Sequence, residues 1–144
     1  MKISIVTVLL LLTFGAGQAD AQGLAGQEKQ ILPLIKGNWL AFRNYSGKQF
    51  VYFSNLLAYR CGLADIRYSV NSDALDRAFR LPPCDPVNPQ VLDAVKYPPF
   101  VTLSPGTAKQ VSVQAVFKDG SKTDIVRFKP CDNAGDSSCA ELVK

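Results

Sequence analysis

The sequence predicts an antiparallel β-sandwich of the immunoglobulin or fibronectin type, with a proline-rich loop and two disulfides, after a cleaved signal peptide. About six short segments are rich in β-branched and aromatic residues, and clusters of Gly, Asn, Asp or Ser separate them. Downstream of the N-terminus, no long segment repeats apolar residues with helical spacing. Short strands joined by turns are typical of this fold class.

The N-terminus predicts export. Lys2 precedes an apolar run over residues 3–16, which is shorter than the roughly 20 residues that a membrane-spanning helix needs. Ala19 and Ala21 have the spacing that signal peptidase recognises, so we expect cleavage after residue 21; a buried N-terminal helix or an uncleaved anchor is the alternative. We expect the protein in the periplasm or outside the cell, with no stable membrane insertion after cleavage. The expected organisation is a signal peptide (1–21), an N-terminal strap (22–38), a β-sandwich (39–131) and a C-terminal disulfide loop and tail (132–144).

The first hairpin is predicted from residues 39–43 and 49–54, around a turn at 44–48. A domain of this size needs large side chains in its core. The residues expected there are Trp39, Phe42, Phe50 and Phe53. Tyr45 beside the turn and Tyr52 on the alternate face are expected at the surface, where they are candidate binding residues.

A second hairpin is predicted from a strand over 66–70, a turn at 71–74 and a return strand over 75–81. Apolar and polar residues alternate in the first of these strands, as a half-buried strand requires. A turn centred between residues 72 and 73 places Val70 opposite Leu75 and Ile66 opposite Phe79.

The same register places Cys61 opposite Cys84, which favours a disulfide between them and leaves Cys131 and Cys139 to close a small loop. Four cysteines formally allow three pairings, and a bulge at Gly62 would shift the register, so the other pairings stay open. The spacings lack the close cysteine pairs of structural zinc sites, so no metal is expected.

Most of the nine prolines lie in residues 82–105, which argues against a central strand there because proline lacks a backbone donor. Residues 90–96 are predicted to form a short helix, with Asn88 as its N-cap and Pro89 at its first position. The rest is expected to be an ordered loop tied at one end by Cys84. Such a loop loses little entropy on binding, so it is the candidate contact surface, with Asn88 and Tyr97 as candidate binding residues.

The third hairpin is the clearest in the chain. Apolar residues alternate over 111–117, Asp119-Gly120 indicates a two-residue turn, and residues 125–129 form the return strand.

The composition excludes several function classes. The sequence has no histidine, which rules out Ser-His-Asp and Cys-His catalysis and histidine-ligated metals. It has no Walker loop and no dinucleotide-binding glycine motif, so no cofactor is expected. The formal net charge of +4 comes from scattered Lys and Arg, so no nucleic acid is expected as a partner.

Three aspartates near the second hairpin, Asp65, Asp73 and Asp76, are candidates for a carboxylate pair or a calcium site, but turn and surface roles explain them better. A catalytic pair of Ser46 and Lys48 lacks the spacing of a known motif. Neither arrangement is expected to be catalytic.

The leading hypothesis is an exported, non-enzymatic protein-interaction module, of an accessory, adhesin-like or inhibitor-like kind, whose partner is another extracytoplasmic protein. A glycan-binding module that uses exposed tyrosines and Trp39 is the first alternative. A histidine-independent hydrolase that uses aspartates is the second. Asn44-Tyr45-Ser46 is a formal N-glycosylation acceptor if the source is a eukaryote.

Overall fold

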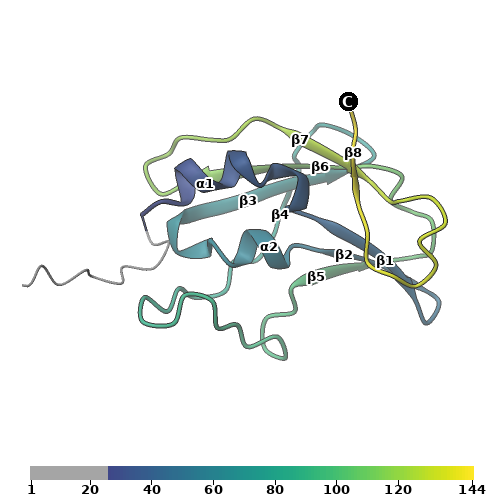
Figure 1. Cartoon of the computed structure of the whole chain (residues 1–144), viewed down its shortest axis with the longest axis horizontal. Helices are drawn as coiled ribbons and strands as arrows, with labels where there is room; N and C mark the ends of the chain where they lie inside the picture. The colour runs from purple at the N-terminus through teal and green to yellow at the C-terminus, as the bar shows by residue number, and fades with distance from the viewer. Residues whose placement is uncertain (1–25) are drawn as a thin grey trace, which may run out of the picture.

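The computed structural model describes residues 26–144, which form two antiparallel sheets with a few short helices (Figure 1). The predicted signal peptide and its cleavage site lie outside the described residues. The smaller sheet has the order β1-β2-β5, with β1 Ala41–Tyr45, β2 Lys48–Tyr52 and β5 Phe100–Leu103. The larger sheet has the order β4-β3-β6-β7-β8, with β3 Leu63–Val70, β4 Arg77–Ala78, β6 Val111–Phe117, β7 Val126–Lys129 and β8 Glu141–Leu142. The prediction of a mainly β, antiparallel fold is confirmed.

The helices are short. They are α1 Glu28–Leu34, η1 Lys36–Asn38, α2 Ser54–Leu57 and η2 Arg60–Gly62. The segment expected as a strap therefore contains a helix, α1. The indole Nε1 of Trp39 donates a buried hydrogen bond of 3.0 Å to the carbonyl of Leu32, and both side chains belong to the core. This bond fixes α1 to the sheets.

Both sheets contribute to one hydrophobic core, because alternate side chains along each strand point inward. Trp39, Phe42 and Phe53 are buried, as expected. The prediction for Phe50 is wrong: its side chain is only half-buried. Because a strand repeats every two residues, Phe50 shares the outer face of β2 with Tyr52, whereas Val51 takes the inner face.

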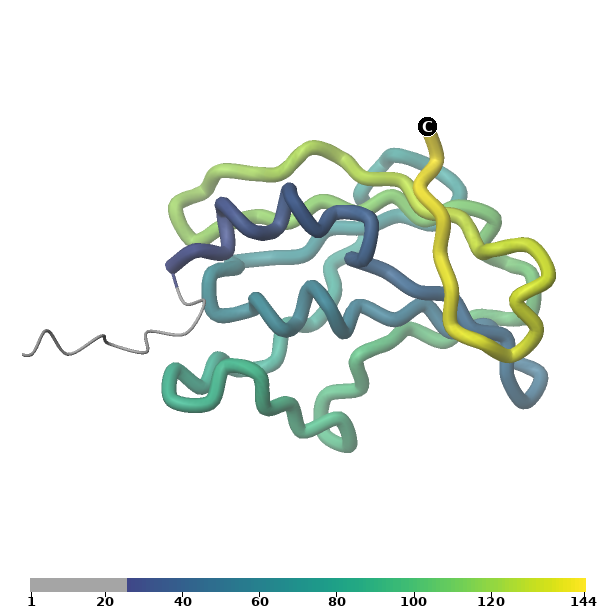
Figure 2. Tube along the Cα trace, in the orientation of Figure 1, coloured from purple at the N-terminus to yellow at the C-terminus, as the bar shows by residue number. Residues whose placement is uncertain are grey.

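The C-terminal segment closes one side of the structure. Phe42 in β1 and Cys139 exchange two backbone hydrogen bonds of 2.9 Å each, and β8 pairs with β7. The segment therefore joins the two sheets, and Figure 2 shows it in yellow, crossing their ends. A disulfide between Cys131 and Cys139 anchors it. The strand β8 within this tail was not predicted. On the opposite side, β5 and β4 are the edge strands.

The first and third hairpins are confirmed. Ser46 and Gly47 form the tight turn between β1 and β2, both with positive φ (50° and 69°). Between β6 and β7, the amide of Phe117 donates to the carbonyl of Ser121 at 2.8 Å, so the turn has three residues rather than the predicted two. Gly120 closes this turn with a φ of 82°, which glycine adopts without a steric penalty.

The second hairpin has the predicted register but a wider turn. Arg67 pairs with Ala78, and the amide of Phe79 donates to the carbonyl of Ile66 at 2.8 Å. The expected pair of Val70 with Leu75 does not form, because the first residue of the turn bonds to another segment of the chain. The side chain of Asn71, which follows Val70, bonds to the backbone between β5 and β6.

The disulfide between Cys61 and Cys84 is present, as the predicted register implied, with the Cα atoms 4.9 Å apart. Cys61 nevertheless lies in η2 rather than in a strand. Together with the Cys131–Cys139 bond, it gives the pairing favoured from the sequence.

Two predictions for the proline-rich region are wrong. Residues 90–96 form turns and no helix, because the Asp93 carboxylate accepts the amides of Val95 and Lys96 and closes a local turn there. The loop also ends earlier than expected, because β5 lies within the predicted range and pairs with β2. Pro99, directly before β5, accepts a hydrogen bond from the Phe53 amide but lacks an N–H to donate one back, as is tolerated at the start of an edge strand.

Candidate functional site

A buried arginine fixes the proline-rich loop, residues 82–99, to the domain. Arg60 is 4 % exposed, and its guanidinium donates to four backbone carbonyl oxygens. The acceptors are Leu57 (3.1 Å), Pro83 (3.0 Å), Pro89 (2.6 Å) and Val91 (2.7 Å). Three of the four belong to the loop, so the rigid fork of N–H donors determines the path of the loop. We call residues 82–99 the braced loop.

The disulfide between Cys61 and Cys84 adds a covalent anchor next to Arg60. It restrains the start of the braced loop, where Arg60 also bonds to Pro83. Two independent restraints at one point favour a single loop conformation, which lowers the entropy that binding would cost.

Carboxylates shape the turns within the braced loop. Asp85 accepts the backbone amides of Val87 (2.9 Å) and Asn88 (3.1 Å). The hydrogen bond from the Asn88 amide, followed by that from Val87, lowers the pKa of Asp85 below its usual value. The loop is therefore ordered by its own side chains as well as by the domain.

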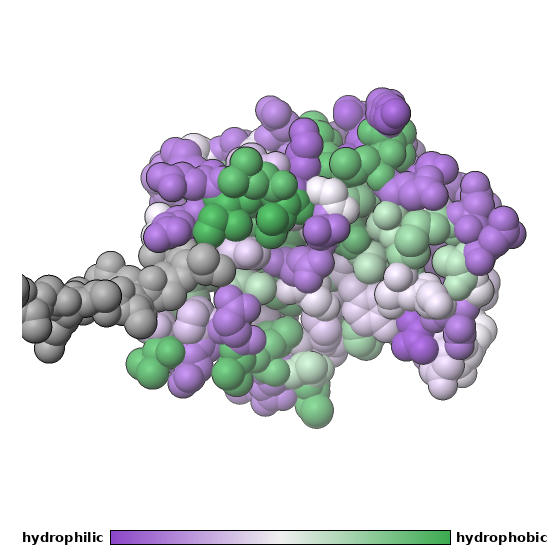
Figure 3. Space-filling model, viewed as in Figure 1, coloured by the Kyte–Doolittle hydropathy of each residue, from purple (hydrophilic) through white to green (hydrophobic). Residues whose placement is uncertain are grey.

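Three valines on the braced loop point into solvent. Val87 is 84 % exposed, Val91 is 65 % exposed and Val95 is 95 % exposed. Figure 3 shows apolar surface on the lower part of the molecule, where Figure 1 places this loop. Apolar side chains held in water by a rigid loop are typical of an interaction surface. Neither these valines nor Arg60 is among the functional residues predicted from the sequence.

Of the two candidate residues in this loop, Asn88 is exposed and lies beside Val87. Tyr97 is half-buried at the end of the loop, with the Arg80 guanidinium 5.0 Å and the Lys96 ammonium 5.4 Å from its ring centroid. Both distances fit cation–π contacts. Asn88 and Tyr97 are thus on the same loop but in different surroundings.

Aromatic side chains gather on the outer face of the smaller sheet. The rings of Phe50, Tyr52 and Phe100 lie 5.2–6.1 Å apart between centroids, and all three are half-buried. We call these three residues the aromatic patch. Tyr45, at the end of β1, is 52 % exposed and carries the Arg43 guanidinium 4.5 Å from its ring centroid. Tyr52 is therefore less exposed than expected, whereas Tyr45 is at the surface as predicted.

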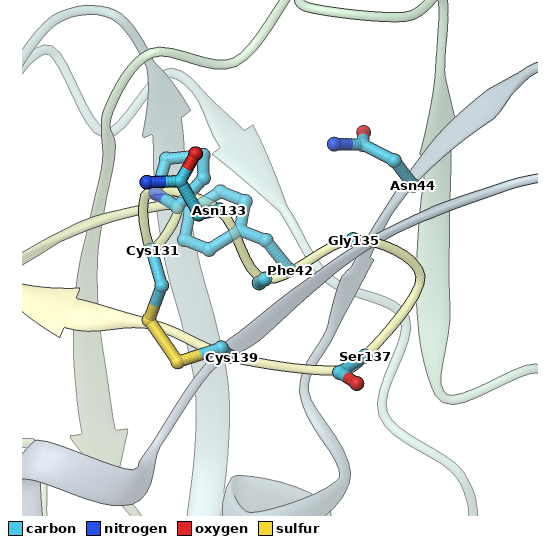
Figure 4. A pocket seen from close by; sticks show the side chains of 9 residues that line it. Phe42, Asn44, Cys131, Asn133, Gly135, Ser137 and Cys139 are labelled. Atoms are coloured by element: carbon cyan, nitrogen blue, oxygen red, sulfur yellow. A yellow bond between two sulfur atoms is a disulfide. The ribbon is translucent and has the colours of Figure 1, made fainter.

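A cavity of about 260 Å³ lies between β1 and the C-terminal disulfide loop (Figure 4). Its polar side chains are Asn44, Asn133 and Ser137, and Phe42 and the Cys131–Cys139 disulfide line it beside them. These groups offer hydrogen bonds but no ionisable side chain. The cavity can hold a small polar molecule, but it lacks the groups for acid–base catalysis.

The candidate aspartates are not brought together as a site. Asp73 forms a bidentate ion pair with Arg127 and accepts a hydrogen bond from the Ser112 hydroxyl, which lowers its pKa, with the Arg127 bond as the larger cause. Asp65 lies 3.8 Å from Arg67, and Asp76 is exposed. Within residues 26–144, no group of three or more acidic or cysteine side chains has the geometry to hold a metal ion.

The pair of Ser46 and Lys48 lies at the β1–β2 turn, where both residues are exposed. Ser46 is a turn residue with positive φ, and Lys48 begins β2. Neither residue therefore has the buried setting of a catalytic serine–lysine pair.

Comparison with protein-family models, curated proteins and solved structures gives no match. Among the described residues, no helix has the length and apolar character needed to cross a bilayer.

Proposed function

We propose that this protein is an exported, non-enzymatic interaction module that binds another protein through the braced loop. The observation that carries the proposal is the exposure of Val87, Val91 and Val95 on a loop that Arg60 and a disulfide hold in place. Exposed apolar groups gain free energy when a partner covers them. Because the loop is already ordered, little of that gain is lost to entropy.

We also propose that the two sheets form an immunoglobulin-like or fibronectin-like sandwich. The strand order β1-β2-β5, and the order β4-β3-β6-β7 of the larger sheet without its additional edge strand β8, follow the orders A-B-E and C′-C-F-G of immunoglobulin-like sheets. In such sandwiches, loops at the ends of the sheets carry binding, as the braced loop would here.

Export is the third part of the proposal. Disulfides persist in oxidising compartments, and this domain contains two. We expect the exported protein to begin at Gln22 and to be found in the periplasm or the medium. N-terminal sequencing tests this directly, and a protein that begins at Met1 would contradict it.

The test of binding uses the disulfide-bonded domain as bait for proteins of the source cell envelope and medium. The informative variant is V87D/V91D/V95D, which places charges on the exposed surface without touching the core. L34D is the matched control, because Leu34 is an exposed apolar residue (84 %) outside the loop. We expect a stoichiometric partner with the wild type and L34D and none with the triple variant. Equal capture by all three would contradict the proposal.

The aromatic patch supports glycan binding as a second candidate, because rings on a sheet face can stack on sugars. Trp39 takes no part in it, since it is 1 % exposed. If glycans bind here, Tyr52→Ala lowers retention on cell-wall polysaccharide while the melting temperature stays unchanged. Unchanged retention removes this candidate.

A further inference from the structure

On one side of the structure, the two sheets end in the edge strands β5 and β4; we call the region between these two strands the seam. Directly before β5, the carbonyl of Pro99 accepts a hydrogen bond of 2.7 Å from the amide of Phe53, so Pro99 occupies a position of the ladder that bonds to the partner strand. In an antiparallel pair of strands, every second residue forms backbone hydrogen bonds to the partner strand. Val101 and Leu103 are therefore the residues of β5 that bond to β2. The backbone groups of Phe100 and Thr102 therefore point away from β2 and into the seam.

The other side of the seam repeats this arrangement. Directly after β4, the amide of Phe79 donates to the carbonyl of Ile66 in β3, so the backbone groups of Ala78 in β4 point away from β3. No strand among residues 26–144 pairs with the outer edge of β5 or β4. Free donors and acceptors thus face the seam from both of its edges.

The seam also contains a cavity of about 200 Å³. The residues that line it come from β3, from β4 and the segment after it, from β5 and from the end of the braced loop, and they include Ala78, Arg80, Lys96, Tyr97, Phe100 and Val101. Its volume suits one or two aliphatic side chains rather than a larger ligand.

The charge around this cavity is positive. Arg80 and Lys96 both line it and both lie near the Tyr97 ring, and its lining includes no carboxylate. Within residues 26–144, neither cation forms an ion pair. Both cations are exposed, so they are available to an acidic ligand.

We propose that the seam is a strand-addition site for an extended segment of a partner protein in which acidic and aliphatic residues alternate. The segment pairs with the free backbone groups of Phe100 and Thr102, as an added β-strand does. Its aliphatic side chains enter the cavity, and its carboxylates meet Arg80 and Lys96. This inference rests on the proposed protein-binding function and names the chemistry of the partner.

The test is a titration of the isotopically labelled domain with the peptide acetyl-Asp-Val-Asp-Val-Asp-Val-Asp-amide, followed by NMR. We expect chemical-shift changes and slowed hydrogen exchange at the amides of Phe100 and Thr102. A peptide with Lys in place of Asp should bind at least tenfold more weakly. If the shifts appear elsewhere, or if both peptides bind equally, the proposal is wrong.

Two sets of variants test the backbone pairing itself. Thr102→Pro removes an N–H that faces the seam and leaves the β2–β5 ladder intact, so binding should fall at least tenfold, whereas Thr102→Ala should bind as the wild type does. Should Thr102→Pro fail to fold, the peptide supplies the same test. One peptide is N-methylated at all its Val amides and a second at all its Asp amides. Because only alternate amides of an added strand face β5, one of these peptides should lose binding and the other should keep it. Loss of binding by both methylated peptides, or by neither, contradicts strand addition.

The outcomes separate this inference from the proposed function. One outcome is that the wild type and Thr102→Pro both capture a partner that V87D/V91D/V95D does not capture. This result would support the loop as the binding surface and would refute the strand-addition site. Concentration-dependent dimerisation of the wild type that Thr102→Pro abolishes would assign the seam to a second copy of this chain instead. Sedimentation equilibrium of both proteins distinguishes these cases.

Discussion

Arg60 is a buried cation whose hydrogen-bond partners are neutral carbonyls. Burial of a guanidinium is unfavourable unless its donors are satisfied, and here four carbonyls accept hydrogen bonds from it. Three of these carbonyls belong to a loop with little regular structure. The hydrogen bonds from the Arg60 side chain therefore satisfy backbone groups of the loop that no neighbouring strand satisfies. A single residue therefore connects the core to the proposed contact surface.

Replacement of Arg60 by Lys should lower the free energy of unfolding by about 2 kcal/mol, because an ammonium keeps the charge but cannot reach several carbonyls in a fixed plane. Urea denaturation followed by tryptophan fluorescence measures this change. Hydrogen exchange should also speed up for the amides of the braced loop. A loss below about 0.5 kcal/mol would show that Arg60 does not organise the loop.

Gly62 is required by close contact rather than by its φ angle. A Cβ atom there would lie 2.5 Å from the Glu28 Cδ atom, and Glu28 is itself only 5 % exposed. Gly62→Ala should therefore cost about 1 kcal/mol or more. In a background of Glu28→Ala the same change should be nearly neutral, which a double-mutant cycle measures by thermal unfolding. An equal cost in both backgrounds would contradict the contact.

At the scale of elements, the braced loop depends on two anchors that act on the same segment. Chain-entropy arguments give roughly 3 kcal/mol for a disulfide that closes a loop of this length. The C61A/C84A variant should lose about that much stability and should also weaken partner binding, because the free loop must then be ordered on binding. The C131A/C139A variant is the control, and its effect on binding should be small. Equal effects of both variants on binding would contradict the assignment of the contact surface to the loop.

Carboxylates in three turns make the whole molecule sensitive to acid. Hydrogen bonds from Arg127 to Asp73, from the Asn88 amide to Asp85 and from Ser121 to Asp119 lower the pKa of each carboxyl in the folded state. A lowered folded pKa contributes stability above the unfolded value of about 3.9, and this contribution is lost as the pH falls through the folded value.

We therefore expect a melting temperature that is nearly constant from pH 8 to pH 5, since no histidine titrates there, and that falls below about pH 4. Circular dichroism at a series of pH values measures it. Asp73→Asn should reduce both the stability at pH 7 and the steepness of the acid transition. A transition centred near pH 6 would contradict this electrostatic account.

At the scale of the whole molecule, period-two patterns predicted the three hairpins and the register that pairs Cys61 with Cys84. The same patterns missed β5 and β8, because each is short and is defined by a partner strand distant in sequence. The short helix at 90–96 was predicted from a proline and an N-cap, but local carboxylate bonds form turns there instead. The role of Arg60 could not be predicted from the sequence. Its acceptors are backbone carbonyls, and every residue has a backbone carbonyl whatever its side chain is.

The measurement that tests the central claim most directly is the affinity of the isolated partner, obtained by calorimetry, for the wild type, V87D/V91D/V95D and L34D. If the braced loop is the contact surface, the triple variant binds at least a hundredfold more weakly, because three apolar contacts are lost and charges are buried in their place. L34D should bind as the wild type does, and all three proteins should melt at similar temperatures. Unchanged affinity of the folded triple variant would show that the partner binds elsewhere.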